Sequence, residues 1–207
     1  MSYMFRAYRS LENDNMTHQM SLREQADFTA DLDGIADDEG RKAVFNRFRT
    51  IRDNGAIAPD LPTDSGRAGA YSMVAVCGAR LVYTTYETAR RADVSVLLGR
   101  WLAERPLDPS ADAPVGETYQ PPSRIESVVR RVQAGEAVTL TVEHRRLIEP
   151  GLSWGFILSE PPAESELAEA ARMVRDEKRR ASHEVRASIV LPVSDLIRPV
   201  LDMLGGE

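Results

Sequence analysis

The first half of the chain has the apolar spacing of helices. A helix over 21–32 begins at Ser21, and Glu24 stands three residues later, which is the spacing of a capping box. A second helix over 41–53 repeats apolar side chains three and four positions apart, as one buried face requires. Gly55 follows this helix and suits the left-handed position at a helix end. We therefore expect two helices joined by an acidic turn.

The residues that follow change from extended to turn-rich and back to helical. Residues 56–59 leave the second helix as an extended piece. Residues 60–69 are rich in turn formers, which indicates a mobile loop or hairpin tip. Ser72 can cap a third helix. A fourth helix is expected over about 88–104, because Pro106 follows it.

A proline-rich segment divides the chain into two parts. Residues 106–122 contain five of the twelve prolines, which is typical of a linker. The pattern beyond it predicts a helix over 123–134, strands over 136–143 and 153–158, a helix over 163–184, a strand over 185–191 and a helix over 192–204. The sequence therefore predicts an α+β protein that is mainly helical before the linker and mixed after it.

The net charge of −6 hides an uneven distribution. Residues 1–40 carry three basic and nine acidic side chains, and residues 106–207 carry twelve and seventeen. Residues 41–105 carry eleven basic against six acidic side chains. A basic block inside an acidic chain is the asymmetry of a nucleic-acid-binding module beside an acidic partner domain, although solvated helix faces are often basic too.

Composition and motifs argue against several classes of protein. Hydrophobic residues make up 43% and charged residues 28%, as in ordinary globular proteins. The sequence has no apolar run of the length of a membrane helix and no signal-peptide core at its start. Cys77 is the one cysteine, and the motifs of common hydrolases, nucleotide-binding loops and zinc enzymes do not occur. We expect a cytoplasmic protein without a membrane segment, metal, cofactor or enzymatic activity.

The basic block contains an ordered series of features that suits DNA. A helix in the major groove needs an apolar face that holds it on its domain and a polar face that meets bases and phosphates, and 41–53 has both. The glycine-flanked Arg67 can approach the DNA backbone, and Tyr71 can donate its hydroxyl hydrogen to a phosphate, although it can also be a core residue. The candidate DNA-binding residues are Arg41, Lys42, Asn46, Arg47, Arg49, Arg67 and Tyr71.

This stretch resembles the winged-helix DNA-binding region of the MerR family of transcriptional regulators. In that family the recognition helix is followed by an exit of the type G-L-I-x-P, a wing containing G-x-R-x-Y, and a helix opened by a polar residue. Here the exit reads Gly55-Ala56-Ile57-Ala58-Pro59, the wing contains Gly66-Arg67, and Tyr71-Ser72 opens the next helix. The resemblance implies that Arg47 or its neighbours enter the groove and that Arg67 and Tyr71 contact phosphates. The usual aromatic pair of the recognition helix is replaced by Asn-Arg-Phe-Arg, so its base contacts do not transfer directly.

We therefore predict a sequence-specific, DNA-binding transcriptional regulator of the MerR-like type. Its predicted parts are a flexible N-terminus (1–20), a winged helix-turn-helix domain (21–105), a linker (106–122) and an α+β domain for dimerisation or sensing (123–207). The alternative is a protein-interaction adaptor or phage-type structural component that has this fold and does not bind DNA. An enzyme with an unrecognised site is a third, weaker reading.

The expected partners are double-stranded DNA and a second copy of the chain, held through residues 123–207. The last helix, 192–204, carries more apolar residues than one buried stripe needs. The helix over 163–184 is acidic near its start and basic near its end, which suits an antiparallel pair but also suits the helix dipole alone. Both helices may equally cover the strands of their own chain, and that alternative stays open at this stage.

Overall fold

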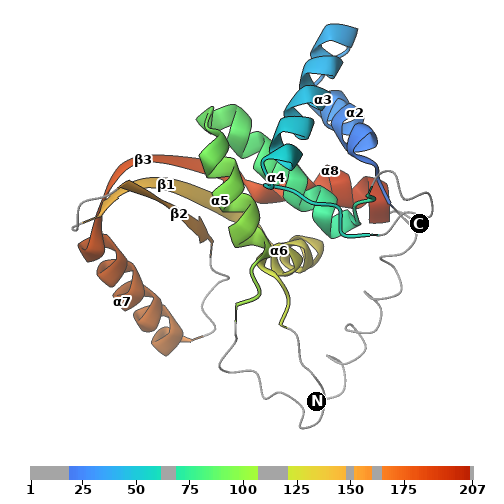
Figure 1. Cartoon of the computed structure of the whole chain (residues 1–207). Coiled ribbons are helices and arrows are strands. Elements are labelled where there is room, and N and C mark those ends of the chain that lie inside the picture. The colour runs from blue at the N-terminus through green and yellow to red at the C-terminus, as the bar shows by residue number, and fades with distance from the viewer. Residues whose placement is uncertain (1–18, 62–68, 107–120, 148–151, 160–164, 206–207) are drawn as a thin grey trace, which may run out of the picture.

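The computed structural model describes residues 19–61, 69–106, 121–147, 152–159 and 165–205. Figure 1 shows most of the helices gathered near one end of a small sheet, while one helix stands apart at the other end. The elements are α2 (Leu22–Leu32), α3 (Asp38–Asp53), α4 (Met73–Ala89), α5 (Ala92–Ala103), α6 (Arg124–Gln133), β1 (Thr139–Leu147), β2 (Leu152–Leu158), α7 (Glu166–Ser182), β3 (His183–Pro192) and α8 (Val193–Gly205). The predicted α+β class is confirmed.

Helices α2 and α3 begin where side chains satisfy backbone N–H groups that have no partner inside the helix. Ser21 and Glu24 form the predicted capping box. Asp37 accepts a hydrogen bond from the backbone N–H of Gly40 at 2.7 Å, and α3 therefore begins at Asp38 rather than at Arg41. The acidic residues that suggested a turn instead occupy the N-terminus of α3, where negative charge is favourable.

The three strands form an antiparallel sheet in the order β2-β1-β3. Its inner face carries Leu140, Val142 and Leu191, all of which are buried. Strands β1 and β3 extend further than the apolar alternation predicted, because the polar residues near His144 continue the backbone pairing with both neighbours. An irregularity in β3 next to His144 shifts the register of the pairing.

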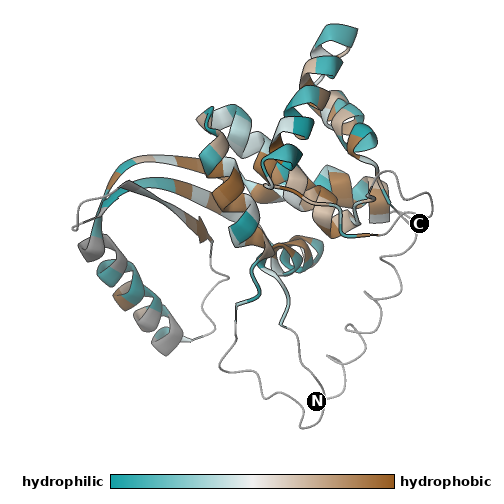
Figure 2. Ribbon diagram, viewed as in Figure 1, coloured by the Kyte–Doolittle hydropathy of each residue, from teal (hydrophilic) through white to brown (hydrophobic). Residues whose placement is uncertain are grey.

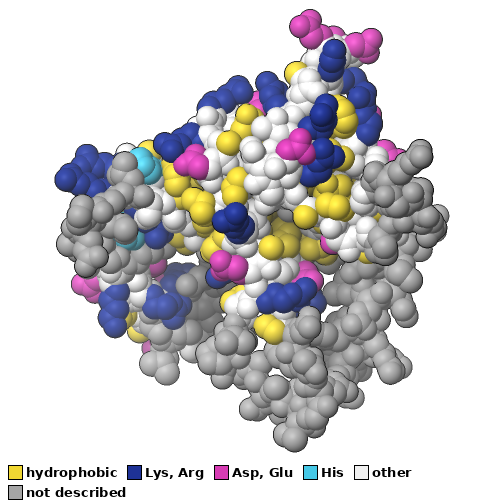
Figure 3. All heavy atoms as spheres, in the orientation of Figure 1, with side chains coloured by type: hydrophobic (Ala, Val, Ile, Leu, Met, Phe, Trp, Pro, Cys, Tyr) yellow, Lys and Arg dark blue, Asp and Glu magenta, His cyan; other side chains and the backbone are white. Residues whose placement is uncertain are grey.

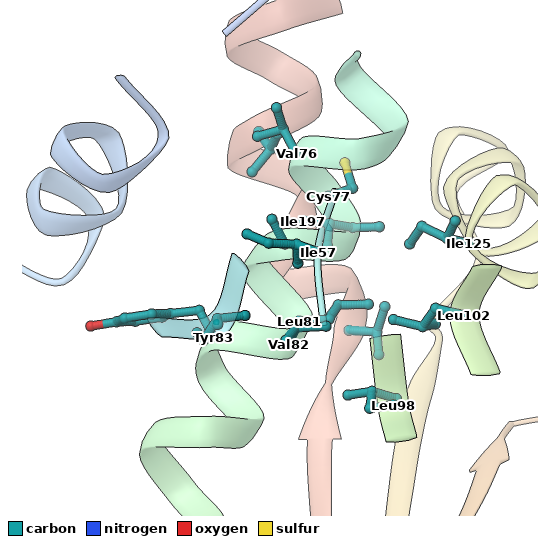
Figure 4. Packing of buried hydrophobic residues seen from close by; sticks show 14 of the residues in the cluster. Ile57, Val76, Cys77, Leu81, Val82, Tyr83, Leu98, Leu102, Ile125 and Ile197 are labelled. Atoms are coloured by element: carbon teal, nitrogen blue, oxygen red, sulfur yellow. The ribbon is translucent and has the colours of Figure 1, made fainter. Parts of the chain in front are cut away.

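One hydrophobic core joins the two parts of the chain. Helix α4 lies at its centre and packs against α5, α6 and α8. Figure 4 shows Cys77 and Leu81 of α4 near Leu98 of α5, Ile125 of α6 and Ile197 of α8. The hydrophobic positions of these helices gather where the elements meet (Figure 2). The segments before and after the predicted linker thus share their core, and the boundary between separate domains stays a prediction.

Helix α8 belongs to this core. The side chains of Val193, Ile197, Val200, Leu201 and Leu204 are buried, and the helix packs against α4, α6 and β1. Such packing against several elements requires a wider apolar surface than one stripe. The surplus of apolar side chains in α8 is therefore used within its own chain, and a homodimer through 123–207 stays a prediction.

Met20 corrects the predicted extent of the flexible N-terminus. It is buried, and its backbone N–H and C=O pair with Tyr71 at 3.1 and 3.0 Å. Residue 20 is therefore fixed to the segment that precedes α4. Residues 1–18 lie outside the described part of the chain, so the prediction for them is untested.

Candidate nucleic-acid interface

Helices α2 and α3 are joined by a turn that is tied to the core. The turn contains Gly34 with φ of +71°, a left-handed conformation that glycine adopts at low cost. Just before it, the Asp33 carboxylate accepts hydrogen bonds from both terminal nitrogens of Arg80, at 2.5 and 3.2 Å. Arg80 belongs to α4 and its side chain is only 9% exposed. This paired contact fixes the angle at which α3 leaves the core.

Helix α3 has one buried face and one exposed face. Val44, Phe48 and Ile51 are buried, and the Phe48 ring stacks on the Tyr83 ring of α4 with centroids 4.9 Å apart. The predicted DNA-binding residues Lys42, Asn46 and Arg49 are all exposed. Their spacing of four and three residues places them in one row along the helix. This row is the surface of α3 that is free to meet another molecule.

Two other predicted residues of α3 are engaged with neighbouring helices. Arg41 is half-buried and forms an ion pair with Asp31 of α2. Arg47 is also half-buried, and its Nε lies 3.0 Å from Oε1 of Glu87 in α4. The guanidinium group of Arg47 also lowers the pKa of the Tyr83 phenol, against the larger raising effect of burial. Both arginines thus connect α3 to the rest of the fold, and neither stands in the exposed row.

Glu87 connects Arg47 with a basic corner formed by Arg90 and Arg91, which were not among the predicted DNA-binding residues. Its Oε2 lies 3.2 Å from a terminal nitrogen of Arg90, so one carboxylate holds an arginine of α3 and an arginine at the end of α4. Arg90 adopts a left-handed conformation with φ of 53°, and its side chain is 68% exposed. Arg91 follows and is also exposed. Arg47 and Glu87 are 40 residues apart in the sequence, so a local sequence pattern does not predict their contact.

The two segments that flank the predicted wing pair with each other. Leu61 and Ala70 form an antiparallel bridge. Next to it, the backbone N–H and the hydroxyl of Ser72 donate hydrogen bonds to the two carboxylate oxygens of Asp60, at 2.8 and 2.5 Å. Ser72 also caps α4, as predicted. Residues 62–68, which include the predicted phosphate ligand Arg67, lie outside the described residues.

Tyr71 has a place in the core rather than on the surface. The residue is 2% exposed, and burial, the largest effect on its phenol, raises the pKa above its ordinary value. Its backbone joins Met20 to the base of the hairpin. A phosphate contact would require the hydroxyl to become exposed, so the structure favours the core interpretation of this residue.

Charged side chains gather along the upper edge of the molecule. Figure 3 shows Lys and Arg side chains over α3 and over the corner between α4 and α5. Acidic side chains accompany them, and Asp38 and Glu39 occupy the first turn of α3. The exposed basic side chains therefore lie along the middle of α3 and at Arg90, whereas the N-terminus of α3 is acidic.

A cavity of about 280 Å³ lies behind the exit of α3, between Ile57, α4, α5 and α6. Its polar groups are already paired, Asp60 with Ser72 and Arg105 with Glu126. This cavity has no free charge for a ligand. The described residues also contain no group of three or more His, Cys, Asp or Glu residues placed to hold a metal ion.

Comparison with protein-family models and curated proteins gives no match for this chain. No protein-family model matches the sequence, and no curated protein matches it significantly. None of the helices within the described ranges is long and apolar enough to cross a membrane. Arguments about function therefore depend on the geometry above.

Proposed function

We propose that this chain binds double-stranded DNA with α3 in the major groove, as a sequence-specific transcriptional regulator of the MerR-like type. The exposed row of Lys42, Asn46 and Arg49 carries the proposal. Its opposite face is fixed by Phe48 in the core, and the turn before it is fixed by Arg80. A helix held in this way can enter a groove without loss of its own packing.

The elements around α3 support the same arrangement. A short antiparallel bridge follows α3 and is tied to the start of α4, which is the place of a wing beside a recognition helix. Arg90 lies next to α3 through its pairing with Glu87 and can reach a neighbouring phosphate. The finer assignment to the MerR type depends on the sequence resemblance alone.

A charge-matched pair of variants tests the proposal. Lys42→Ala with Arg49→Ala removes two positive charges from the exposed row. Arg100→Ala with Arg198→Ala removes two exposed charges from α5 and α8, on other parts of the surface. Affinity for random duplex DNA, measured by fluorescence anisotropy at several salt concentrations, should fall at least about tenfold for the first variant only. Its salt slope should decrease by roughly 1.8 if two phosphate contacts are lost.

Asn46 should distinguish bases rather than phosphates. Its amide can form two hydrogen bonds to adenine in the major groove. Selection from a random duplex library would define a preferred site, and Asn46→Ala should then weaken binding to that site by about 1–3 kcal/mol while nonspecific binding stays the same. An equal loss on both kinds of DNA would assign Asn46 to the backbone and contradict sequence recognition through this side chain.

Arg67 of the predicted wing provides a further test of DNA binding. Arg67→Ala should weaken binding to all sequences alike and reduce the salt slope by roughly one unit. If the wild-type chain shows no binding to duplex DNA at low salt, that result would favour the alternative function. The chain would then be an adaptor or phage-type structural component that has this fold and does not bind DNA. We also propose that the protein acts as a homodimer through 123–207, so that two copies can bind a palindromic site.

A further inference from the structure

Helix α7 has few contacts with the other described elements. Figure 1 shows it at the end of the sheet, away from the other helices, and its main contact is with β3, the strand that follows it. None of its side chains that the structure describes is buried. Met173 is 65% exposed and Val174 is 51% exposed. An isolated helix of this length is marginally stable in water, so α7 needs another surface to pack against.

The more apolar side of α7 is the more exposed one. Ala170 and Val174 are four residues apart, share one side and are exposed. Glu169, Arg172 and Asp176 lie toward the other side and are half-buried. A surface helix normally turns its apolar side inward. The reversed arrangement indicates that the apolar side of α7 is covered by something outside the described residues.

Strand β3, which follows α7, also carries exposed apolar side chains. Val185 is 46% exposed and Val190 is 61% exposed. The strand is an edge of the sheet, since it pairs with β1 on one side only. Most of its side chains between the two ends are exposed. Four of the seven large hydrophobic side chains that are exposed in the described residues thus belong to α7 and β3, and they define the α7–β3 surface.

The charges of α7 fit a second copy of the same chain. The first turn is acidic, with Glu166 and Glu169, whereas residues 175–180 carry four basic and two acidic side chains. Two such helices placed antiparallel bring each acidic end beside a basic half of the partner, and a parallel pair would bring like charges together.

We propose that the α7–β3 surface is the interface of a twofold homodimer, in which α7 packs antiparallel on α7 of a second copy. Val174 is the middle residue of α7 and lies at the crossing point with its own counterpart. This inference is independent of DNA binding, since it concerns a different surface and is tested without DNA.

Cross-linking tests the crossing point directly. Val174→Cys should form a disulfide between two copies under mild oxidation, giving a product of twice 23.0 kDa on a non-reducing gel. The natural Cys77 is buried and burial raises its pKa to about 12, so it does not interfere. Leu97→Cys is the matched control, because Leu97 is 42% exposed on α5, away from this surface, and should give little or no covalent dimer.

Charge exchange tests the antiparallel arrangement. Glu166→Lys with Glu169→Lys makes both ends of α7 basic, and Arg175→Glu with Lys178→Glu makes both ends acidic. Each variant alone should dimerise at least about tenfold more weakly than the wild type in sedimentation velocity, because like charges meet at both ends. An equimolar mixture of the two should form a heterodimer again, and circular dichroism should confirm that each variant is folded.

The expected results and the contrary results are distinct. A wild-type dimer that is weakened by Val174→Asp, cross-linked at residue 174 and restored by mixing supports the proposal. A wild-type protein that stays at 23.0 kDa at micromolar concentration overturns it. A dimer that Val174→Asp and both charge variants leave unchanged overturns it as well, because the contact then lies elsewhere.

Discussion

Helices α3 and α7 are similar in length and in their high content of charged residues, but their surroundings in the structure are opposite. They have 16 and 17 residues, both are rich in charge, and both are amphipathic. α3 buries its apolar side against its own chain and leaves a polar row exposed. α7 leaves its apolar side exposed. An amphipathic pattern therefore predicts a helix with a face to cover, but the three-dimensional structure shows whether the chain itself covers that face.

The largest expected effect separates the two apolar faces. Phe48→Ala in α3 should lower the free energy of unfolding by about 3–5 kcal/mol, because it removes a buried ring that stacks on Tyr83. Val174→Ala in α7 should change it by less than about 0.5 kcal/mol in the monomer, because this side chain is half-exposed there. Urea unfolding at a protein concentration where the chain is monomeric measures both changes.

Similar losses for the two variants would contradict the comparison. A large loss at Val174 in the monomer would show that α7 packs within the chain. A small loss at Phe48 would show that the contact between α3 and α4 is weak, and α3 could not then be held rigidly at a groove. Each outcome bears on one helix only.

The sequence predicted elements more fully than it predicted contacts. The capping box at Ser21, the two faces of α3 and the strand pattern are local, and local spacing is enough to identify them. The pairing of Arg47 with Glu87 and the burial of Tyr71 depend on residues that are distant in sequence. For the same reason the surplus of apolar residues in α8 was assigned to a partner, although α4 and α6 cover it.

The second prediction concerns the fit around the exit of α3. A Cβ on Gly99 of α5 would overlap the backbone oxygen of Ala56, whereas a Cβ on Gly78 of α4 would lie 3.5 Å from Ile125, an ordinary contact. Gly99→Ala should therefore cost about 1–3 kcal/mol by overpacking. Gly78→Ala should stabilise the chain by about 0.5–1 kcal/mol, because glycine is unfavourable inside a helix.

Thermal unfolding of both glycine variants gives the sign directly. The two substitutions add the same methyl group, so they are controls for each other. Destabilisation by Gly78→Ala would mean that α4 and α6 lie closer together than in this structure. A neutral Gly99→Ala would mean that the segment after α3 can shift, in contrast with the fixed exit on which the proposed presentation of α3 depends.

The third prediction uses titration to test the burial of two side chains of α4 in the core. Burial raises the pKa of the Tyr83 phenol, and it raises the pKa of the Cys77 thiol to about 12. These groups return to ordinary values near 10 and 8.5 in the unfolded chain. The unfolded state therefore holds fewer protons at alkaline pH, and their contribution to stability is complete below about pH 8.5 and lost as the pH rises.

The loss should reach up to about 1.4 kcal/mol per pH unit for each group that is ionised only in the unfolded state. Urea midpoints between pH 7 and pH 10.5 measure it. Cys77→Ala should lower stability at pH 7 and flatten the decline between pH 9 and pH 10, because one of the titrating groups is then absent. A decline that is equally steep in this variant would show that the thiol is accessible to water in the folded chain.

The smallest expected effect concerns the start of α3. Asp37 accepts a hydrogen bond from Gly40 N at 2.7 Å, so Asp37→Ala should cost about 1 kcal/mol through the loss of the cap. Asp38→Asn is the control, because it removes one negative charge from the first turn and leaves the cap in place, at a cost of about 0.3–1 kcal/mol.

The row from Lys42 to Arg49 begins beyond the first turn. Asp37→Ala should therefore leave the preferred DNA sequence unchanged. The affinity for that DNA should fall only as far as fraying of the first turn disturbs the row. If this variant abolished DNA binding in a folded protein, the first turn of α3 would belong to the contact surface, and the proposed placement of the DNA along the middle of the helix would be wrong.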